Sequence, residues 1–283
     1  MRYAIGLPNV KEYADPKLLV TLSVEAEASG WDGVFVWDHL LYREESNAVV
    51  DPWTSVAAIA EATDMVRLGV MVTALARRRP WTVAREAVTV DVLSDGRLTF
   101  GAGLGSLRDE FRLFGEESDE RVRATKLDEA LDIVVGLWSG ESFAYEGNHY
   151  KVNPVRFVPT PVQSPRIPVW IAGRWPNRRP FRRAARWDGI FATHDEIAHN
   201  QTMSTAQLEE IVAYTRSHRS DTDGNFDVVI EGLTIGSDHR KEAELVADYA
   251  AVGLTWWVEK LGWFRGSVEE ARERIRRGPP GAG

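Results

Sequence analysis

The chain of 283 residues contains no cysteine. Disulfides, thiolate zinc sites and cysteine nucleophiles are therefore excluded, because each of them requires a thiol. Long apolar runs are also missing, since no stretch approaches the roughly 20 residues that cross a bilayer. The N-terminal segment 1–8 leads directly into a strand pattern and lacks the features of a signal peptide. We therefore expect a cytoplasmic protein.

Basic residues are fewer than acidic ones, with 34 Lys and Arg against 42 Asp and Glu and a formal net charge of −8. Such a surface repels phosphate backbones and anionic membranes at long range, although local basic patches can still hold a small anionic ligand. Nucleic acids and membranes are therefore not expected as partners. His194, His199 and His218 lack the spacing of a metal site, so no metal is expected either.

Strand and helix patterns alternate along most of the chain. Asp15-Pro16 and Asp51-Pro52 each supply an N-cap and a first-turn proline. Strand starts recur about every 30 residues, the length of a βα repeat. The expected strands are 3–7, 33–37, 66–73, one beginning at 97, 169–172, 189–192, 226–231 and 255–258. Eight parallel strands predict an α/β fold, a (β/α)8 TIM barrel formed by one domain over residues 1–283.

The βα rhythm is interrupted by an insertion at about 106–167. It holds a helical pattern over 121–138, a hairpin pattern over 141–152 and a proline-rich connector over 154–168. Near the C-terminus, Ser267 and Glu270 form a capping-box pattern that starts the last helix. The glycine- and proline-rich tail 278–283 is expected to be frayed.

The segment Gly101-Ala-Gly-Leu-Gly105 ends the fourth strand with alternating glycines. Glycine lets the backbone approach a flat ring or a phosphate closely, and parallel α/β folds bind ligands at the carboxyl ends of their strands. Ser106 stands where a dinucleotide fingerprint requires another glycine, which disfavours a Rossmann fold. The alternative interpretation is a tight turn with no ligand.

Asp38-His39 follows the second strand directly, at the rim where barrel enzymes carry their active sites. Imidazole side chains exchange protons in the physiological pH range, so His39 could move a proton beside a bound cofactor. His39 could instead simply bond the backbone at a strand end. Asp38 is expected to brace the loop or to orient His39.

Arginines and glycine follow the fifth strand in the segment Ala172-Gly-Arg-Trp-Pro-Asn-Arg-Arg179. Backbone amides at a helix start, aided by Arg174, Arg178 or Arg179, would attract a phosphate. The arginine-rich helix that follows, with Arg182, Arg183 and Arg186, could instead be a solvated face with acidic partners. Several of the 11 tryptophans, including Trp37, Trp170 and Trp256, lie in or next to strands and could either face a planar ligand or pack the core.

Taken in chain order, a series of segments resembles the bacterial luciferase-like family. This family contains flavin mononucleotide (FMN) monooxygenases and oxidoreductases that use the deazaflavin coenzyme F420. No single segment is diagnostic, but their order covers nearly the whole chain. The segments are 30–39, 67–73, 79–86, 93–98, 101–105, 110–111, 137–140, 145–150, 168–173 and 184–189.

The resemblance implies a cofactor ring in the barrel mouth and a cofactor phosphate near the loops after strands five and six. It also implies a histidine bordering the ring at the place of His39, a non-prolyl cis peptide bond near Met71-Val72 and a homodimer formed through the second and third helices. The expected cofactor-binding residues are Asp38, Met71, Val72, Thr73, Gly103, Gly105, Ser106, Ala172, Gly173, Arg174, Arg178 and Arg179.

The sequence therefore favours an oxidoreductase that moves hydride or activates oxygen through FMN or F420, with a small organic substrate. The Asp-His pair resembles the F420 enzymes slightly more, and both cofactors stay open. Ser106 replaces the glutamate of the sugar-phosphate dehydrogenase branch, so that substrate is not carried over. Two alternatives are a non-catalytic flavin-binding protein of this fold and a barrel isomerase of a phosphorylated metabolite.

Overall fold

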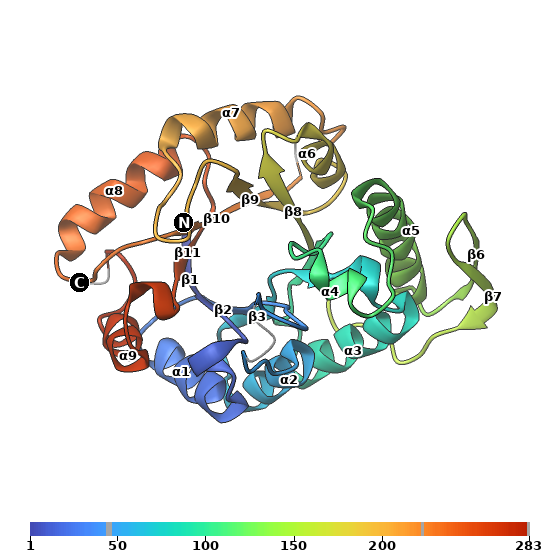
Figure 1. The fold of residues 1–283 in the computed structure, drawn as a ribbon, viewed down its shortest axis with the longest axis horizontal. Coiled ribbons are helices and arrows are strands. Elements are labelled where there is room, and N and C mark those ends of the chain that lie inside the picture. Colours follow the sequence, from blue (N-terminus) through green and yellow to red (C-terminus); the bar gives the residue numbers. More distant parts are fainter. Residues whose placement is uncertain (44–46, 222–223, 282–283) are drawn as a thin grey trace.

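Parallel strands surround a central axis and helices form the outer layer in the computed structural model, which describes residues 1–43, 47–221 and 224–281 (Figure 1). The strands form one sheet in the order β3-β2-β1-β11-β10-β9-β8-β5-β4. Their bounds are β1 (Arg2–Leu7), β2 (Gly33–Val36), β3 (Arg67–Val70), β4 (Thr73–Ala74), β5 (Phe100–Gly103), β8 (Val169–Trp175), β9 (Gly189–His194), β10 (Asp227–Gly232) and β11 (Trp256–Lys260).

The two ends of this sheet meet, because β3 and β4 are the two halves of the third barrel strand. β3 pairs with β2, and β4 pairs with β5. Leu68 forms a parallel bridge to Leu98, and the amide of Thr99 donates to the Leu68 carbonyl at 2.8 Å. The predicted (β/α)8 barrel is therefore confirmed. The strand expected over 66–73 is interrupted where Met71 and Val72 are joined by a cis peptide bond, as the resemblance implies.

The predicted helix starts are confirmed where side-chain caps define them. Asp15 accepts a hydrogen bond from the Lys17 amide at 2.9 Å, Asp51 accepts one from the Thr54 amide at 2.8 Å, and Ser267 forms the expected capping box. The outer helices are α1 (Pro16–Ala28), α2 (Pro52–Ala62), α3 (Pro80–Leu93), α6 (Arg178–Ala184), α7 (Thr205–Arg216), α8 (His239–Ala251) and α9 (Val268–Arg276). Short 3-10 helices are η1 (Lys11–Tyr13), η2 (Leu75–Arg77) and η3 (Trp263–Arg265). No helix of the described ranges is long and apolar enough to cross a membrane.

The insertion contains α4 (Asp109–Arg112), α5 (Glu120–Trp138) and a hairpin of β6 (Ser142–Glu146) and β7 (Lys151–Arg156) that projects beyond α5 (Figure 1). The carboxylate of Glu129 on α5 holds the hairpin turn by accepting hydrogen bonds from the amides of Asn148, His149 and Tyr150. The second strand runs past the expected end at residue 152, through Pro154. A proline is tolerated there because a two-stranded hairpin leaves one edge of each strand unpaired.

Large apolar side chains fill the interior of the barrel. Trp170 and Trp256 are fully buried, with ring centroids 5.4 Å apart, so the packing interpretation holds for both. The inner cluster consists of Ala4, Phe35, Met71, Trp170, Phe191, Val229, Trp256 and Val258. Side chains alternate along a strand, so residues two or four positions after these inner residues are the next to face the open carboxyl end, which we call the mouth. The mouth-facing residues of six strands are Gly6, Trp37, Arg174, Thr193, Glu231 and Lys260.

The expectation of a frayed tail is wrong for its first three residues. Gly278, Pro279 and Pro280 are buried, and a guanidinium nitrogen of Arg274 donates to the Gly278 carbonyl at 2.7 Å. Proline has no amide hydrogen to satisfy, so this segment can dock against the protein at low cost. Residues 282–283 lie outside the described part of the chain.

Candidate active site

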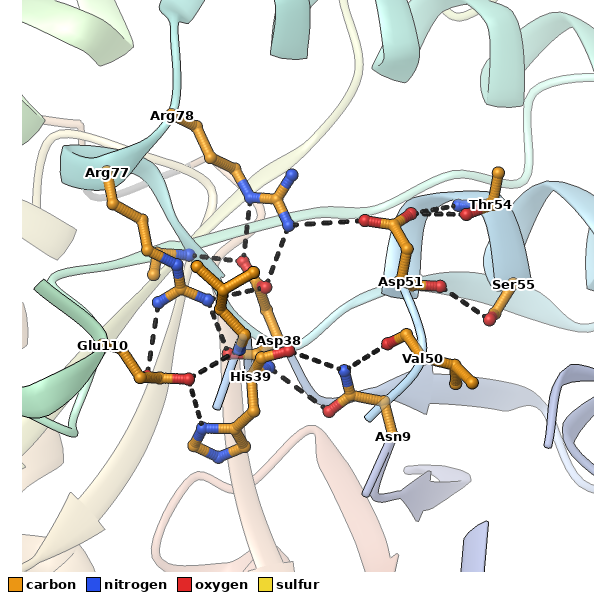
Figure 2. A network of polar contacts seen from close by, with 12 residues as sticks. Asn9, Asp38, His39, Val50, Asp51, Thr54, Ser55, Arg77, Arg78 and Glu110 are labelled. Carbon is orange, nitrogen blue, oxygen red and sulfur yellow. Dashed lines mark hydrogen bonds and ion pairs between the residues drawn. The ribbon is translucent and has the colours of Figure 1, made fainter. Parts of the chain in front are cut away.

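His39 lies at the mouth and is held by Glu110, a residue of the insertion. Nδ1 of His39 lies 3.2 Å from Oε1 of Glu110 (Figure 2). The Glu110 side chain is 1% exposed and the His39 side chain 12%. The same carboxylate accepts the amides of Leu40 at 2.6 Å and Leu41 at 3.2 Å. An ionised carboxylate only accepts hydrogen bonds, so we assign the proton to Nδ1 of His39, which leaves Nε2 free to exchange a proton.

Asp38 braces the loop, which is one of the two roles predicted for it. Its carboxylate accepts hydrogen bonds from Arg77 at 2.8 Å, from Arg78 at 3.0 and 3.1 Å and from the Ala74 amide at 3.0 Å (Figure 2). Burial opposes ionisation of this carboxyl, but the charges of Arg77 and Arg78 outweigh it, and the pKa of Asp38 lies below its ordinary value. With these partners and 1% exposure, the Asp38 side chain is directed at the protein. Its assignment to the cofactor remains a prediction.

Asn9, in the loop after β1, fixes the backbone of the histidine. Its amide nitrogen donates to the carbonyls of His39 at 3.0 Å and Val50 at 2.7 Å, and its oxygen accepts the His39 amide at 3.3 Å (Figure 2). The loops after β1 and β2 are thereby tied together beneath His39. The sequence analysis missed Asn9, since a single asparagine after a strand carries no specific signal.

Three of the expected cofactor-binding residues form a wall of small side chains at the mouth. A Cβ atom placed on Gly103 would lie 2.7 Å from Cγ2 of Val72 and 3.2 Å from Cβ of Ala172. Gly103 of β5, Ala172 of β8 and Val72, which directly precedes β4, therefore meet on the inner side of the barrel. Val72 and Ala172 are partly exposed, so this small-residue wall presents no bulky side chain to a flat ring, and the residues present fit the cofactor that the resemblance implies. Met71 lies just below it in the inner cluster.

The other expected residues around the glycines have different surroundings. Thr73 is fully buried, and its hydroxyl has no hydrogen-bond partner among the described residues. Gly105 has φ +80°, which favours glycine, and a Cβ there would lie 3.0 Å from Ala74 and Phe111. Ser106 follows it at the exposed rim. A Cβ on Gly173 would meet Phe181 at 3.0 Å, so that glycine allows α6 to pack on β8.

The three arginines expected to share a phosphate are separated by the fold. Arg174 faces the mouth, whereas the guanidinium of Arg178 stacks over Trp175 and Tyr214, at 5.7 and 5.2 Å from the ring centroids. Arg179 lines a cavity of about 240 Å³ between α5 and α6, which is bordered also by Leu104 and Arg121. Only Arg174 and Arg179 are thus placed to reach a ligand.

Two later arginines, Arg183 of α6 and Arg186 just after this helix, have the acidic partner of the alternative interpretation, although Arg183 is buried rather than solvated. Arg183 and Arg186 both pair with Asp128 of α5, at 2.7 and 2.9 Å. They hold the insertion against the barrel.

A second polar group at the mouth escaped the sequence analysis. Nζ of Lys260 lies 2.8 Å from Oε2 of Glu231, and Nε1 of Trp37 donates to Oε1 of Glu231 at 3.2 Å. Strand alternation was the available signal, since both charged residues continue an apolar inward-facing series. Glu110 belongs to one of the segments that resemble the family, but the sequence analysis assigned no role to it.

Three comparisons agree on the type of protein. Residues 3–279 match the family model described as luciferase-like monooxygenase. An F420-dependent glucose-6-phosphate dehydrogenase of Amycolatopsis mediterranei (strain U-32) is 29% identical over 257 residues, covering 89% of this chain and 75% of that protein. The fold is similar to that of the monooxygenase RslO1 from Streptomyces bottropensis, with a TM-score of 0.77, 21% identity and coverage of 98% and 97%.

The coenzyme F420 dependent tetrahydromethanopterin reductase from Methanopyrus kandleri has a similar fold as well. Its TM-score is 0.75 at 15% identity, with coverage of 98% of this chain and 96% of that one. At such identities the structural likeness concerns the fold alone, whereas the family model covers nearly the whole sequence. The chain belongs to the luciferase-like monooxygenase family.

Proposed function

We propose that this protein is an oxidoreductase that binds F420, or alternatively FMN, with the ring against the small-residue wall and His39 beside it. The observation that carries the proposal is the contact between Val72, Gly103 and Ala172, which lines this side of the mouth with small residues. The membership of the family and the F420-dependent relative support the same class of reaction. When bound, such a cofactor supplies the two-electron chemistry, and the protein supplies binding, orientation and protons.

His39 has the role of exchanging a proton through Nε2 with a group in the mouth. Glu110 fixes the imidazole tautomer through Nδ1 and stabilises the charge that forms when His39 takes up a proton. Asn9 fixes the backbone of His39, Arg77 holds the carbonyl of the preceding Asp38, and Glu110 restrains the imidazole itself. Trp37 and the buried tryptophans of the inner cluster limit the access of water from the barrel interior.

F420 is the first choice because the relative from Amycolatopsis mediterranei is named F420-dependent. The substrate of that relative is not assigned to this chain, because Ser106 stands where the sugar-phosphate branch carries a glutamate. The insertion supplies Glu110 instead, but its carboxylate is engaged with His39 and two amides.

The test is a titration of the purified protein with F420 and, separately, with FMN, followed by fluorescence. We expect saturable binding of one of the two. Turnover with a panel of alcohols and carbonyl compounds then distinguishes an enzyme from a flavin-binding protein without turnover. If neither cofactor binds, the proposal is wrong and the barrel isomerase becomes the better hypothesis.

A further inference from the structure

Three cationic side chains come together on the His199 side of the mouth. Lys260 ends β11 and continues the inward series of Trp256 and Val258, and Arg174 continues the inward series of Trp170 and Ala172 on β8. Arg43 reaches the mouth from the loop after β2, where its guanidinium lies 3.1 Å from Nε2 of His199. Cations from three separate elements therefore converge.

Glu231 supplies a carboxylate that faces this group. It pairs with Lys260 at 2.8 Å and accepts the indole N–H of Trp37 at 3.2 Å. The side chains of Lys260 and Glu231 are only 11% and 13% exposed. The other two acids of the mouth, Asp38 and Glu110, are neutralised by Arg77 and Arg78. Of the three cations, Lys260 is thus the one that the described residues show paired with a carboxylate.

His199 lies at the centre of the cluster and adds no negative charge. Its ring is 5.8 Å from that of Phe264 and 6.2 Å from that of Trp37. Burial, the ammonium of Lys260 and the guanidinium of Arg43 lower the pKa of His199, with a smaller contribution from Arg174. A neutral imidazole accepts the hydrogen bond from Arg43 and keeps that guanidinium directed at the mouth.

The local excess of positive charge at the mouth does not follow from the overall composition, because the chain carries a formal net charge of −8. Lys260 is largely buried, whereas Arg43 and Arg174 are exposed, and cations gathered at one side of a site focus the field on an anion that enters it. The side chain of Arg174 forms no hydrogen bond or ion pair with any residue in the part of the chain that the structure describes. If these side chains served only to close the barrel interior, the ion pair of Lys260 and Glu231 would be sufficient, and the two arginines would not be needed.

We propose that Lys260, Arg43 and Arg174 bind an anionic group of the substrate, a carboxylate or a phosphate. The inference rests on the proposed function, since it names the class of substrate for the same mouth. β10 and β11 lie across the barrel from β4 and β5, so the Lys260 side of the anion site lies opposite Val72 and Gly103, whereas Arg174 approaches from β8, beyond Ala172. Trp37 contacts both His39 and Glu231, and it therefore separates the anion-binding end from the proton-exchanging end.

Inorganic phosphate is the probe, titrated into the purified full chain by calorimetry in a non-coordinating buffer. Lys260→Met is expected to weaken phosphate binding about tenfold or more, because a charge-assisted hydrogen bond is lost. Glu231→Gln is expected to strengthen it several-fold, because the competing carboxylate is removed. The matched control is Lys151→Met on the exposed hairpin, which should leave the affinity unchanged.

Opposite effects of the two variants support the proposal, and they cannot both come from misfolding. Equal phosphate affinity in Lys260→Met and Glu231→Gln would overturn it. The titration is repeated at saturating cofactor to distinguish substrate from cofactor as the source of the anion. Phosphate binding that persists supports a substrate site, and binding that is abolished by the cofactor overturns this assignment. A failed cofactor titration with the expected phosphate pattern refutes the proposed function but supports the anion site.

Discussion

The carboxylate of Glu110 lies 3.2 Å from Nδ1 of His39, although 71 residues separate the two in the chain. The short helix α4 carries Glu110 over the end of β5 and down to the loop after β2, where it accepts the amides of Leu40 and Leu41 as well. This contact makes the insertion part of the proton-exchanging site rather than an appendage of the barrel.

Replacing Glu110 with Gln should lower kcat by about 10- to 100-fold, because the carboxylate that orients the imidazole and stabilises its charge is lost. The dissociation constant of the cofactor should change little. Nitrogen NMR of the histidine ring provides a readout independent of activity, since His39 should lose its uniform Nδ1–H tautomer. Glu116→Gln, at an exposed position of the same segment, is the control. An unchanged tautomer would argue against this role for Glu110.

Replacing His39 with Ala should depress turnover by about 10² to 10⁴, the range for loss of a proton-transferring group. Cofactor affinity should fall much less, because the small-residue wall remains. Steady-state kinetics and a fluorescence titration measure the two effects separately. His218→Ala, at an exposed site beyond α7, serves as the control. Turnover equal to that of the parent would return His39 to a purely structural role.

Replacing Asp38 with Asn should destabilise the protein by about 3–5 kcal/mol at pH 7, because two partly buried guanidinium groups lose their carboxylate. The pKa of Asp38 is lowered in the folded state, so the unfolded chain binds more protons in acid. The stabilisation is therefore complete above the ordinary pKa of 3.8 and is lost as the pH falls through the folded-state value.

Urea unfolding of the parent and of Asp38→Asn between pH 7 and pH 3 checks this prediction. The difference between their free energies of unfolding should shrink towards the acid end. The control is Asp109→Asn, whose partner Arg112 is exposed. A difference that is constant with pH would show that charge pairing at Asp38 is not the cause.

Replacing Ala172 with Val should weaken cofactor binding about tenfold or more, because the added methyl groups occupy the small-residue wall beside Gly103. The same substitution at Ala251, an exposed residue at the end of α8, is the matched control. Fluorescence titration gives the affinity and thermal unfolding shows that the variant is folded. Full affinity in a folded Ala172→Val would place the ring elsewhere.

Replacing Arg179 with Gln should weaken cofactor binding several-fold, and salt should diminish the difference, because a charge contact at the cavity beside α5 is removed. Arg178→Gln should have a smaller effect, since Arg178 stacks on Trp175 and Tyr214. Arg182→Gln, on the same helix and exposed, is the control. Titrations at low and high salt compare the cofactor affinities of the three variants. Equal affinities would exclude a cofactor role for Arg179.

The amino-acid sequence by itself determined the elements with local signals. Asp15-Pro16 and Asp51-Pro52 set helix starts because a cap and a fixed proline φ act within one turn. The inward glycines of β5 marked the place of the small-residue wall, and the period of the βα units predicted the barrel. The resemblance located the cis peptide bond between Met71 and Val72.

Tertiary structure alone decided which side chains meet. Arg174, Arg178 and Arg179 are close in sequence, yet the end of a strand and the first turn of a helix send them to three surroundings. Glu110 reaches His39, and Lys260 reaches Glu231, only because a closed barrel brings the carboxyl ends of all its strands to one mouth. Local patterns cannot encode such pairs, since their geometry depends on ring closure and on the path of the insertion.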